Sequence, residues 1–237
     1  MDFVITTFCN LNCKNCWVLI PYYKQPFHYD LEIIKTNLKK LSDCDKVKNI
    51  QLIGGETLLH PDINEIIKYI STLNFDIISI YTNCTVIPNN FKEALQVMDT
   101  RFTLYLTNYP RSTKCEELIK LCDENNTQYE INTFGNIIGS GEGHEWLKAG
   151  NPDVKPFPKN NPDTCGQIMT CMGDKIYRCA RIGHLDQIIG LNLDKDEWCY
   201  IDEIDERYEE LKEVKFTKNC NRCLRGTSMC VNIPKGS

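Results

Sequence analysis

Residues 49–70 read NIQLIGGETLLHPDINEIIKYI and contain both kinds of periodicity that decide the fold. The apolar, β-branched run at residues 50–53 predicts a buried strand. Two glycines, Gly54 and Gly55, follow it. The chain then enters a stripe of apolar residues at helical spacing, made of Ile63, Ile66, Ile67 and Ile70. The segment therefore predicts a strand, a turn and an amphipathic helix.

The same alternation runs through the first 135 residues. Further strands are predicted at residues 3–7, 77–81, 102–106 and 129–132. Further helical stripes are Leu31/Ile34/Leu38/Leu41, Phe91/Leu95/Met98 and Cys115/Leu118/Ile119/Cys122. Strict alternation implies parallel strands with right-handed crossovers. Five strands and four helices are too few to close an eight-unit barrel, so residues 1–135 predict an α/β partial barrel with its chemistry at the carboxyl ends of the strands.

The regular pattern stops after residue 135. Residues 136–160 are rich in Gly, Pro and Asn and predict a loop or linker. Residues 161–237 are dense in cysteine and predict a small α+β module, with a hairpin that turns at Gly173 and Asp174 and an acidic helix around Ile204, Tyr208 and Leu211.

Composition excludes several classes of protein. The 237 residues are 42% hydrophobic, which is enough for a core, and the formal net charge of −5 with no basic block argues against nucleic-acid binding. Apolar runs are too short to span a bilayer, and the first residues do not resemble a signal peptide, so we expect a cytoplasmic protein without a membrane partner. Fourteen cysteines in that compartment indicate metal binding or catalysis instead of a disulfide framework.

Three of these cysteines lie close together in CNLNCKNC, residues 9–16, directly after the first predicted strand. Cys9, Cys13 and Cys16 are one ligand short of a structural zinc site. A [4Fe–4S] cluster held by three thiolates instead keeps one iron open for a chelating ligand. Four other cysteines, which follow the apolar stripes or lie in a turn, are interpreted as small core or loop residues: Cys44, Cys115, Cys122 and Cys199.

The cysteine motif after strand one and the GGE of Gly54, Gly55 and Glu56 after strand two together resemble the radical S-adenosylmethionine (SAM) superfamily. The resemblance implies that Cys9, Cys13 and Cys16 ligate a [4Fe–4S] cluster whose open iron chelates SAM. It also implies that one electron then cleaves SAM to a 5′-deoxyadenosyl radical, and that this radical abstracts a substrate hydrogen. A flavodoxin or ferredoxin is the reductant that the resemblance implies.

Further cofactor contacts follow from the same resemblance. The two glycines of GGE give a ligand room to approach, and the Glu56 carboxylate is the candidate acceptor for the SAM ammonium group. Asn83, at the end of the third strand, is a candidate for ribose or methionine contacts. The family usually has an aromatic residue before the third cysteine; here Asn15 occupies that position and Trp17 follows, so Trp17 becomes the candidate for the adenine contact. Cys84 replaces a usual glycine and is a candidate catalytic thiol.

The last part of the chain carries a second set of cysteines. Cys165, Cys179, Cys220 and Cys223 suffice for one auxiliary [4Fe–4S] cluster and resemble a shortened SPASM module, the twitch domain. Cys171 could replace Cys165, and Cys230 could replace Cys223. A structural zinc ion in the same four thiolates is the alternative.

Three function classes remain open on the sequence. The first is a radical SAM oxidoreductase that oxidises or rearranges a sugar, cyclitol or nucleotide-linked metabolite. The second is a peptide-modifying maturase or epimerase, disfavoured because the first strand begins by residue 3 and leaves no room for a leader-binding domain before it. The third is a non-catalytic zinc or iron–sulfur scaffold. Arg178 and Arg181 could contact an anionic substrate, although exposed arginines on a hairpin are more often only solvated.

Overall fold

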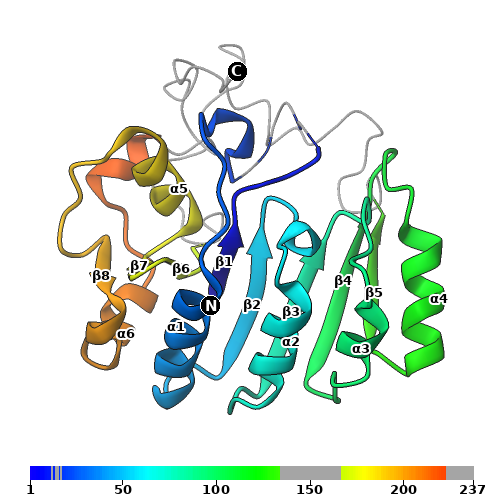
Figure 1. Cartoon of the computed structure of the whole chain (residues 1–237). Coiled ribbons are helices and arrows are strands. Elements are labelled where there is room, and N and C mark those ends of the chain that lie inside the picture. The colour runs from blue at the N-terminus through cyan, green and yellow to red at the C-terminus, as the bar shows by residue number, and fades with distance from the viewer. Residues whose placement is uncertain (12, 14–15, 17, 134–166, 223–237) are drawn as a thin grey trace.

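The computed structural model describes residues 1–11, 13, 16, 18–133 and 167–222 (Figure 1). Its strands form one sheet of eight, in the order β5-β4-β3-β2-β1-β6-β7-β8. The strands are β1 (Asp2–Thr6), β2 (Asn49–Gly54), β3 (Ile77–Thr82), β4 (Phe102–Asn108), β5 (Tyr129–Thr133), β6 (Thr170–Met172), β7 (Lys175–Tyr177) and β8 (Trp198–Tyr200). Strands β1 to β5 are parallel, β6 joins β1 in parallel, and β7 and β8 are antiparallel additions.

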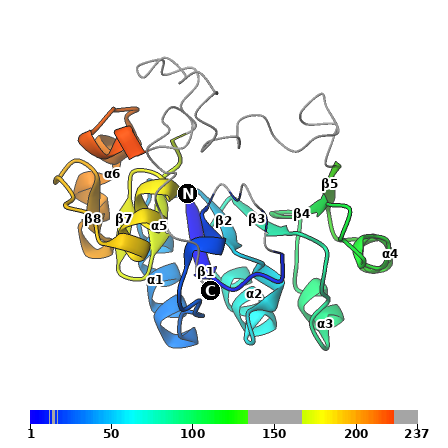
Figure 2. The same cartoon turned by 90° about the horizontal axis from the view of Figure 1, so that it is seen from above.

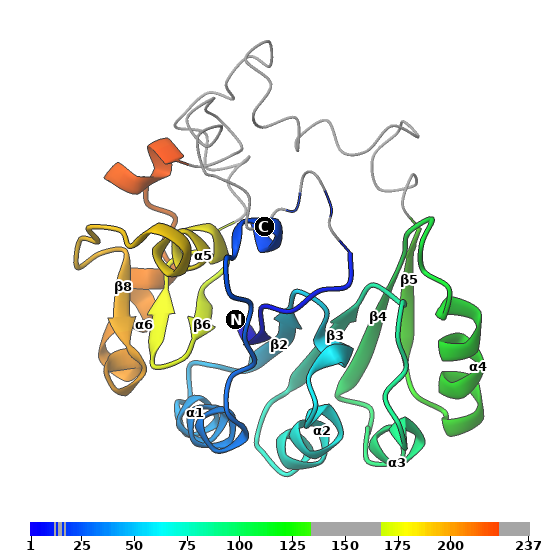
Figure 3. The same ribbon diagram turned by 45° about the horizontal axis from the view of Figure 1, so that its top comes forward.

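Helices lie on both faces of this sheet. They are α1 (Leu31–Asp43), α2 (Ile63–Ser71), α3 (Phe91–Leu95), α4 (Cys115–Asn125), α5 (Ala180–Ile189) and α6 (Ile204–Lys212). Figure 3 shows α1, α2, α3 and α4 along one face of the first five strands, as right-handed crossovers require. Short 3₁₀ helices cover Ile20–Tyr22, Thr57–Leu59, Ile201–Glu203 and Lys218–Arg222. None of the described helices combines the length and apolar character needed to cross a membrane.

Two of the three hydrophobic cores in the described residues lie on the sheet, one on each face, because the side chains of each strand alternate between its faces. The main core lies under α1 to α4 and α6, and takes alternate strand residues such as Phe3, Ile5, Ile50 and Leu52. A second, smaller core lies on the opposite face, where α5 packs on β6 and β7. It consists of Val4, Met172, Tyr177 and Ile182. Seen from above in Figure 2, α1, α2 and α3 all lie on one side of β1 to β4.

Local signals explain where individual helices begin and end. The Asp30 carboxylate accepts hydrogen bonds from the amides of Glu32 (2.9 Å) and Ile33 (3.4 Å), which caps the first turn of α1. Helix α4 is capped at its carboxyl end by Asn126, whose φ of 54° is the left-handed conformation that asparagine tolerates. These caps define where α1 begins and where α4 ends.

The predicted alternation of five strands and four helices is confirmed. Helix α3 is shorter than its apolar stripe suggested, because Met98 lies beyond its end, although the side chain is still buried. The hairpin turn is also confirmed, since Met172 pairs with Lys175 across Gly173, whose φ is +62°. The strand around Cys199 and the acidic helix after it are confirmed as β8 and α6.

The strands of the cysteine-rich region join the first sheet. Asp2 pairs with Thr170 and Phe3 with Cys171, so that β6 to β8 extend this sheet. The parallel pairing of β6 with β1 supplies the hydrogen bonds that would otherwise be missing along that edge of β1. The predicted linker at 136–160 lies outside the described residues, and the domain boundaries stay predictions.

Candidate active site

The chain leaves β1 at Thr6 and crosses the carboxyl end of β2. The amide of Gly55 donates to the carbonyl of Thr6 (3.0 Å). A Cβ on Gly54 would lie 2.6 Å from the Thr6 carbonyl oxygen, and one on Gly55 would lie 2.2 Å from the Phe8 carbonyl oxygen. Both glycines are therefore required by the protein's own backbone, where we had expected them to make room for a ligand. Their close packing brings Cys9 beside the GGE turn.

Glu56 lies at the centre of this crossing and is only 1% exposed. Its carboxylate accepts hydrogen bonds from the amide of Leu58 (2.9 Å), the hydroxyl of Thr82 (2.7 Å) and the amide of Asn83 (2.6 Å). Burial raises its pKa to about 7, and the three hydrogen bonds, led by that from Asn83, oppose the shift. The carboxylate predicted to accept the SAM ammonium group thus already joins the end of β2 to the end of β3.

Asn83 carries this connection on to the cysteine loop. Its amide nitrogen Nδ2 lies 3.6 Å from the sulfur of Cys9 and 3.4 Å from Oδ1 of Asn10. Its Oδ1 accepts the amide of Thr85 (3.0 Å). The sequence-based expectation that Asn83 lies near the cofactor site agrees with this placement beside a predicted cluster ligand.

The three predicted cluster ligands are half-buried neighbours. Burial raises the pKa of Cys9 to about 12, and the nearby Glu56, Cys16 and Cys13 raise it further, while the amide of Leu11 opposes the shift. Burial also raises the pKa of Cys13 and of Cys16. The amide of Cys16 donates to the carbonyl of Cys13 (3.1 Å), which folds the loop into a turn. These thiols favour the neutral form until a metal ion stabilises the thiolate.

No three His, Cys, Asp or Glu side chains among the described residues are arranged as a metal-binding group, and this includes the three loop thiols. The chemistry of the donors nevertheless fits an iron–sulfur cluster with an open iron, because three thiols and no carboxylate or imidazole occupy one short loop. Binding would require this loop to draw its sulfur atoms together.

Two residues after β4 also lie at this site, and the sequence analysis missed them. Burial raises the pKa of Tyr109, and the charges of Cys13, Cys16, Cys9 and Glu56 raise it further, so this side chain lies within electrostatic range of the three cysteines and Glu56. Arg111 lies close enough to Cys13 to oppose the rise in its pKa. Their only sequence signal was a position directly after the carboxyl end of a predicted strand.

The Tyr109 segment is tied to Asn83 through Ser112. The Ser112 hydroxyl donates to the carbonyl of Asn83 (2.5 Å) and accepts the amide of Tyr109 (2.7 Å). The ends of β1, β2, β3 and β4 therefore converge on one place, where parallel α/β sheets bind their ligands.

Two predicted site residues do not appear in this group. Trp17 lies outside the described residues. Cys84 has a φ of 56° and is fully buried in the main core, where burial and the neighbouring Cys115 raise its pKa. In this position the thiol packs as a small apolar side chain, and a role as hydrogen donor stays a prediction.

The comparison with known protein families agrees with this geometry. Residues 3–132 match the family model of the radical SAM superfamily. The chain belongs to the radical SAM superfamily. No curated protein matches the sequence. Among solved structures, the crystal structure of BtrN in complex with AdoMet and 2-DOIA has a TM-score of 0.58 and 15% identity, and the match covers 98% of this chain and 90% of that one. At this identity the likeness shows a shared fold.

Membership in the radical SAM superfamily implies a [4Fe–4S] cluster and SAM, and the loop of Cys9, Cys13 and Cys16 is where this chain offers the ligands. The predicted auxiliary cluster is described only in part. Cys179 and Cys220 are half-buried. Cys165, Cys223 and Cys230 lie outside the described residues. Cys171 is buried in the main core, and its thiol donates to the carbonyl of Gly173 (3.6 Å), which favours a core residue over a ligand.

The expectation for the two hairpin arginines was wrong. Arg178 is fully buried and Arg181 is 4% exposed. Arg178 donates to the carbonyl oxygens of Asp196, Glu210, Leu211 and Glu213, so its guanidinium group holds the end of α6. Neither arginine is a solvated surface side chain, and four of the five N–H donors of the Arg178 guanidinium are bonded to these carbonyl oxygens.

Proposed function

We propose that this chain is a radical SAM oxidoreductase that removes a hydrogen atom from a small metabolite of the sugar or cyclitol kind. The observation that carries the proposal is the convergence of Cys9, Cys13 and Cys16 with Glu56, Asn83 and Tyr109 at the carboxyl end of the sheet. When bound there, a reduced [4Fe–4S] cluster together with SAM supplies a 5′-deoxyadenosyl radical.

The chain's own residues would bind and orient these groups. Cys9, Cys13 and Cys16 would hold the cluster as thiolates. Asn83 can donate its side-chain N–H to the Cys9 sulfur, and Arg111 favours the thiolate of Cys13. Tyr109 is half-buried beside the thiols and would shield them from water. One lone-pair direction of the Glu56 carboxylate remains for the SAM ammonium group, since three are used by the protein.

The face of the sheet away from α1 to α4 supports the choice of substrate class. By strand register, this face of β2 to β5 presents Gln51, Ile53, Ser79, Tyr81, Thr103, Tyr105, Thr107, Glu130 and Asn132. Tyr81 and Tyr105 stack with ring centroids 4.6 Å apart. These nine positions include one carboxylate and no lysine or arginine. A face of this kind favours a neutral or amine-bearing polyol over a phosphate-bearing, nucleotide-linked substrate.

Oxidation of such a substrate needs an acceptor for a second electron. Cys165, Cys179, Cys220 and Cys223 would hold an auxiliary [4Fe–4S] cluster, which would supply this acceptor.

The test replaces one loop cysteine. Cys13→Ala, reconstituted anaerobically with iron and sulfide and reduced with dithionite, should make no 5′-deoxyadenosine from SAM and should lose about four iron atoms per chain. The matched control is Cys44→Ala, a buried cysteine at the end of α1, which should retain both. SAM cleavage by Cys13→Ala at the wild-type rate would disprove the site, and a colourless wild-type protein that binds zinc would favour the scaffold.

A further inference from the structure

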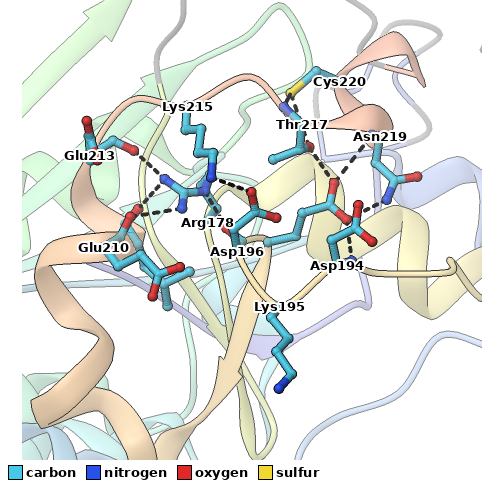
Figure 4. Close-up of polar contacts among 12 residues, drawn as sticks. Arg178, Asp194, Lys195, Asp196, Glu210, Glu213, Lys215, Thr217, Asn219 and Cys220 are labelled. Carbon is cyan, nitrogen blue, oxygen red and sulfur yellow. Dashed lines mark hydrogen bonds and ion pairs between the residues drawn. The ribbon is translucent and has the colours of Figure 1, made fainter.

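Thr217 holds the Cys220 side chain in place through contacts with its sulfur atom. The amide of Thr217 donates to Sγ of Cys220 at 3.3 Å, and the Thr217 hydroxyl oxygen lies 3.5 Å from the same sulfur. The amide of Cys220 in turn donates to the Thr217 carbonyl (3.1 Å). These bonds form a tight turn around the thiol (Figure 4). A backbone N–H directed at a cysteine sulfur is the kind of contact that stabilises a thiolate ligand and tunes a bound cluster.

The side chain of Glu197 holds this turn in place, and Glu197 is fully buried. One carboxylate oxygen, Oε1, accepts the hydroxyl of Thr217 and the amide of Asn219 (3.3 Å). The other, Oε2, accepts the side-chain amide of Asn219 (2.7 Å) and the amide of Asp194 (2.9 Å). All four hydrogen-bond donors are neutral groups. The carboxylate therefore binds Thr217 and Asn219, which precede Cys220 in the turn.

The backbone of Glu197 also pairs with the segment directly before Cys179. The backbone carbonyl of Glu197 accepts the amide of Arg178 (2.8 Å), the residue directly before Cys179. The Arg178 side chain then binds four backbone carbonyls around the end of α6 and the start of β8, as Figure 4 shows in part. Residue 178 is thus bonded to the backbone of Glu197, and Thr217 and Asn219 are bonded to its carboxylate.

A carboxylate is the group that this arrangement requires. Each of its two oxygen atoms accepts two hydrogen bonds, whereas a glutamine has one oxygen and an N–H₂ group that cannot accept. In Glu197→Gln, two of the four donors would face another donor and would have to move. An apolar residue could fill the same volume, so filling space does not explain a buried carboxylate at this position.

We propose that Glu197 is a positioning residue for metal binding, whose carboxylate holds the turn that carries Cys220, a ligand of the auxiliary cluster. The inference rests on the proposed auxiliary cluster. Removing the carboxylate should leave the fold intact and weaken the retention of metal, because the turn that carries Cys220 becomes free to move.

The experiment counts only the auxiliary metal. In a background with Cys9, Cys13 and Cys16 all changed to alanine, the reconstituted protein should hold about four iron atoms per chain. Adding Glu197→Gln should speed the loss of iron to a chelator by roughly 10–100-fold, the usual effect of losing a group that orients a metal ligand. It should also change the electron paramagnetic resonance spectrum of the reduced cluster.

Two controls separate positioning from general loss of stability. Glu213→Gln makes the same chemical change at an exposed side chain, and it should keep the wild-type rate of iron loss. Ile204→Val loosens the buried face of α6 without touching the hydrogen-bond network, and at a comparable fall in Tm it should lose iron more slowly than Glu197→Gln.

The outcomes distinguish a failure of the positioning role of Glu197 from a failure of the proposed auxiliary cluster. If the triple-alanine background holds no iron or only zinc, the auxiliary iron–sulfur cluster is wrong and the inference fails with it. If the background holds iron and Glu197→Gln releases it no faster than Ile204→Val, the cluster stands and the positioning role is wrong.

Discussion

The two cysteine-bearing regions are each built around one buried glutamate, and the two glutamates tie down different kinds of structure. Glu56 binds Thr82 and Asn83 at the end of a central strand of the sheet. Glu197 binds Thr217 and Asn219, which lie in and before a short 3₁₀ helix beyond the sheet. A carboxylate between central strands supports the fold as well as the site, whereas one beside a peripheral turn supports the site alone. Substitutions in the two regions should therefore differ in how far stability and metal binding change together.

Gly55→Ala should have the largest effect. The added Cβ would lie 2.2 Å from the Phe8 carbonyl oxygen, and a backbone atom cannot be moved aside as a side chain can. We expect a loss of about 3 kcal/mol in the free energy of unfolding together with loss of SAM cleavage. Urea denaturation and 5′-deoxyadenosine formation would measure these two effects. Gly190→Ala, which meets no atom within 4 Å but has a φ of +64°, is the control for backbone strain alone. Full SAM cleavage by Gly55→Ala would mean that the β1 crossing does not position the cysteines.

Arg178→Met tests the same comparison in the peripheral region, which contains Cys179 and Cys220. The substitution keeps the buried stem but leaves four backbone carbonyls around α6 without their donors. We expect a loss of about 2–3 kcal/mol in the free energy of unfolding. SAM cleavage at the amino-terminal cysteines should persist once the protein is folded. Loss of SAM cleavage in a folded Arg178→Met protein would show that the two regions act as one unit.

Glu56→Gln should change how stability depends on pH. The folded-state pKa of Glu56 is raised from 4.5 to about 7, so this group favours the folded state below pH 4.5 and that contribution is lost as the pH rises to 7. The metal-free wild type should lose up to about 3 kcal/mol between these pH values relative to the glutamine variant. Urea titrations of both proteins from pH 4.5 to 8 would give the difference, and parallel curves would contradict the burial of a chargeable group.

Thr82→Val should have the smallest effect of the set. It keeps the β-branched shape of the side chain in β3 and removes the hydroxyl that donates to Glu56 at 2.7 Å. One hydrogen bond to a buried carboxylate predicts a loss of about 1–2 kcal/mol. Isothermal titration with SAM should show a small decrease in affinity. An effect larger than that of Glu56→Gln would mean that Thr82 contacts the cofactor directly.

Much of the fold could be predicted because its elements have a clear period. The strand residues Ile50 and Leu52 and the helical stripe from Ile63 to Ile70 are buried as their spacing indicated. The pairing of β6 with β1 could not be predicted, since a strand of three residues carries too little periodicity to identify its neighbour.

The site was predictable where residues are close in sequence and hidden where they come together only in space. Cys9, Cys13 and Cys16 identify themselves by spacing, but Tyr109 reaches them from β4 and resembles any aromatic residue in a loop. Arg178 was interpreted as solvated because nothing in its neighbourhood shows that carbonyl groups 32–35 residues away will surround it. The buried glutamates share this property, since Thr82 and Asn83 lie 26 and 27 residues from Glu56, and Thr217 and Asn219 lie 20 and 22 residues from Glu197.

The position of β1 between β2 and β6 has a consequence for the newly made chain. The ribosome releases β1 first, and β2 to β5 can add to it in turn, but its other edge pairs with residues 170 and 171. Until that distant segment emerges, β1 presents an unpaired edge beside a finished half-sheet, which is a surface prone to association with other chains. Pairing across so large a sequence separation is also slow. Completion of the sheet is thus expected to be the late step in biogenesis, and the cysteine loop that follows β1 would be exposed on an unfinished scaffold until then.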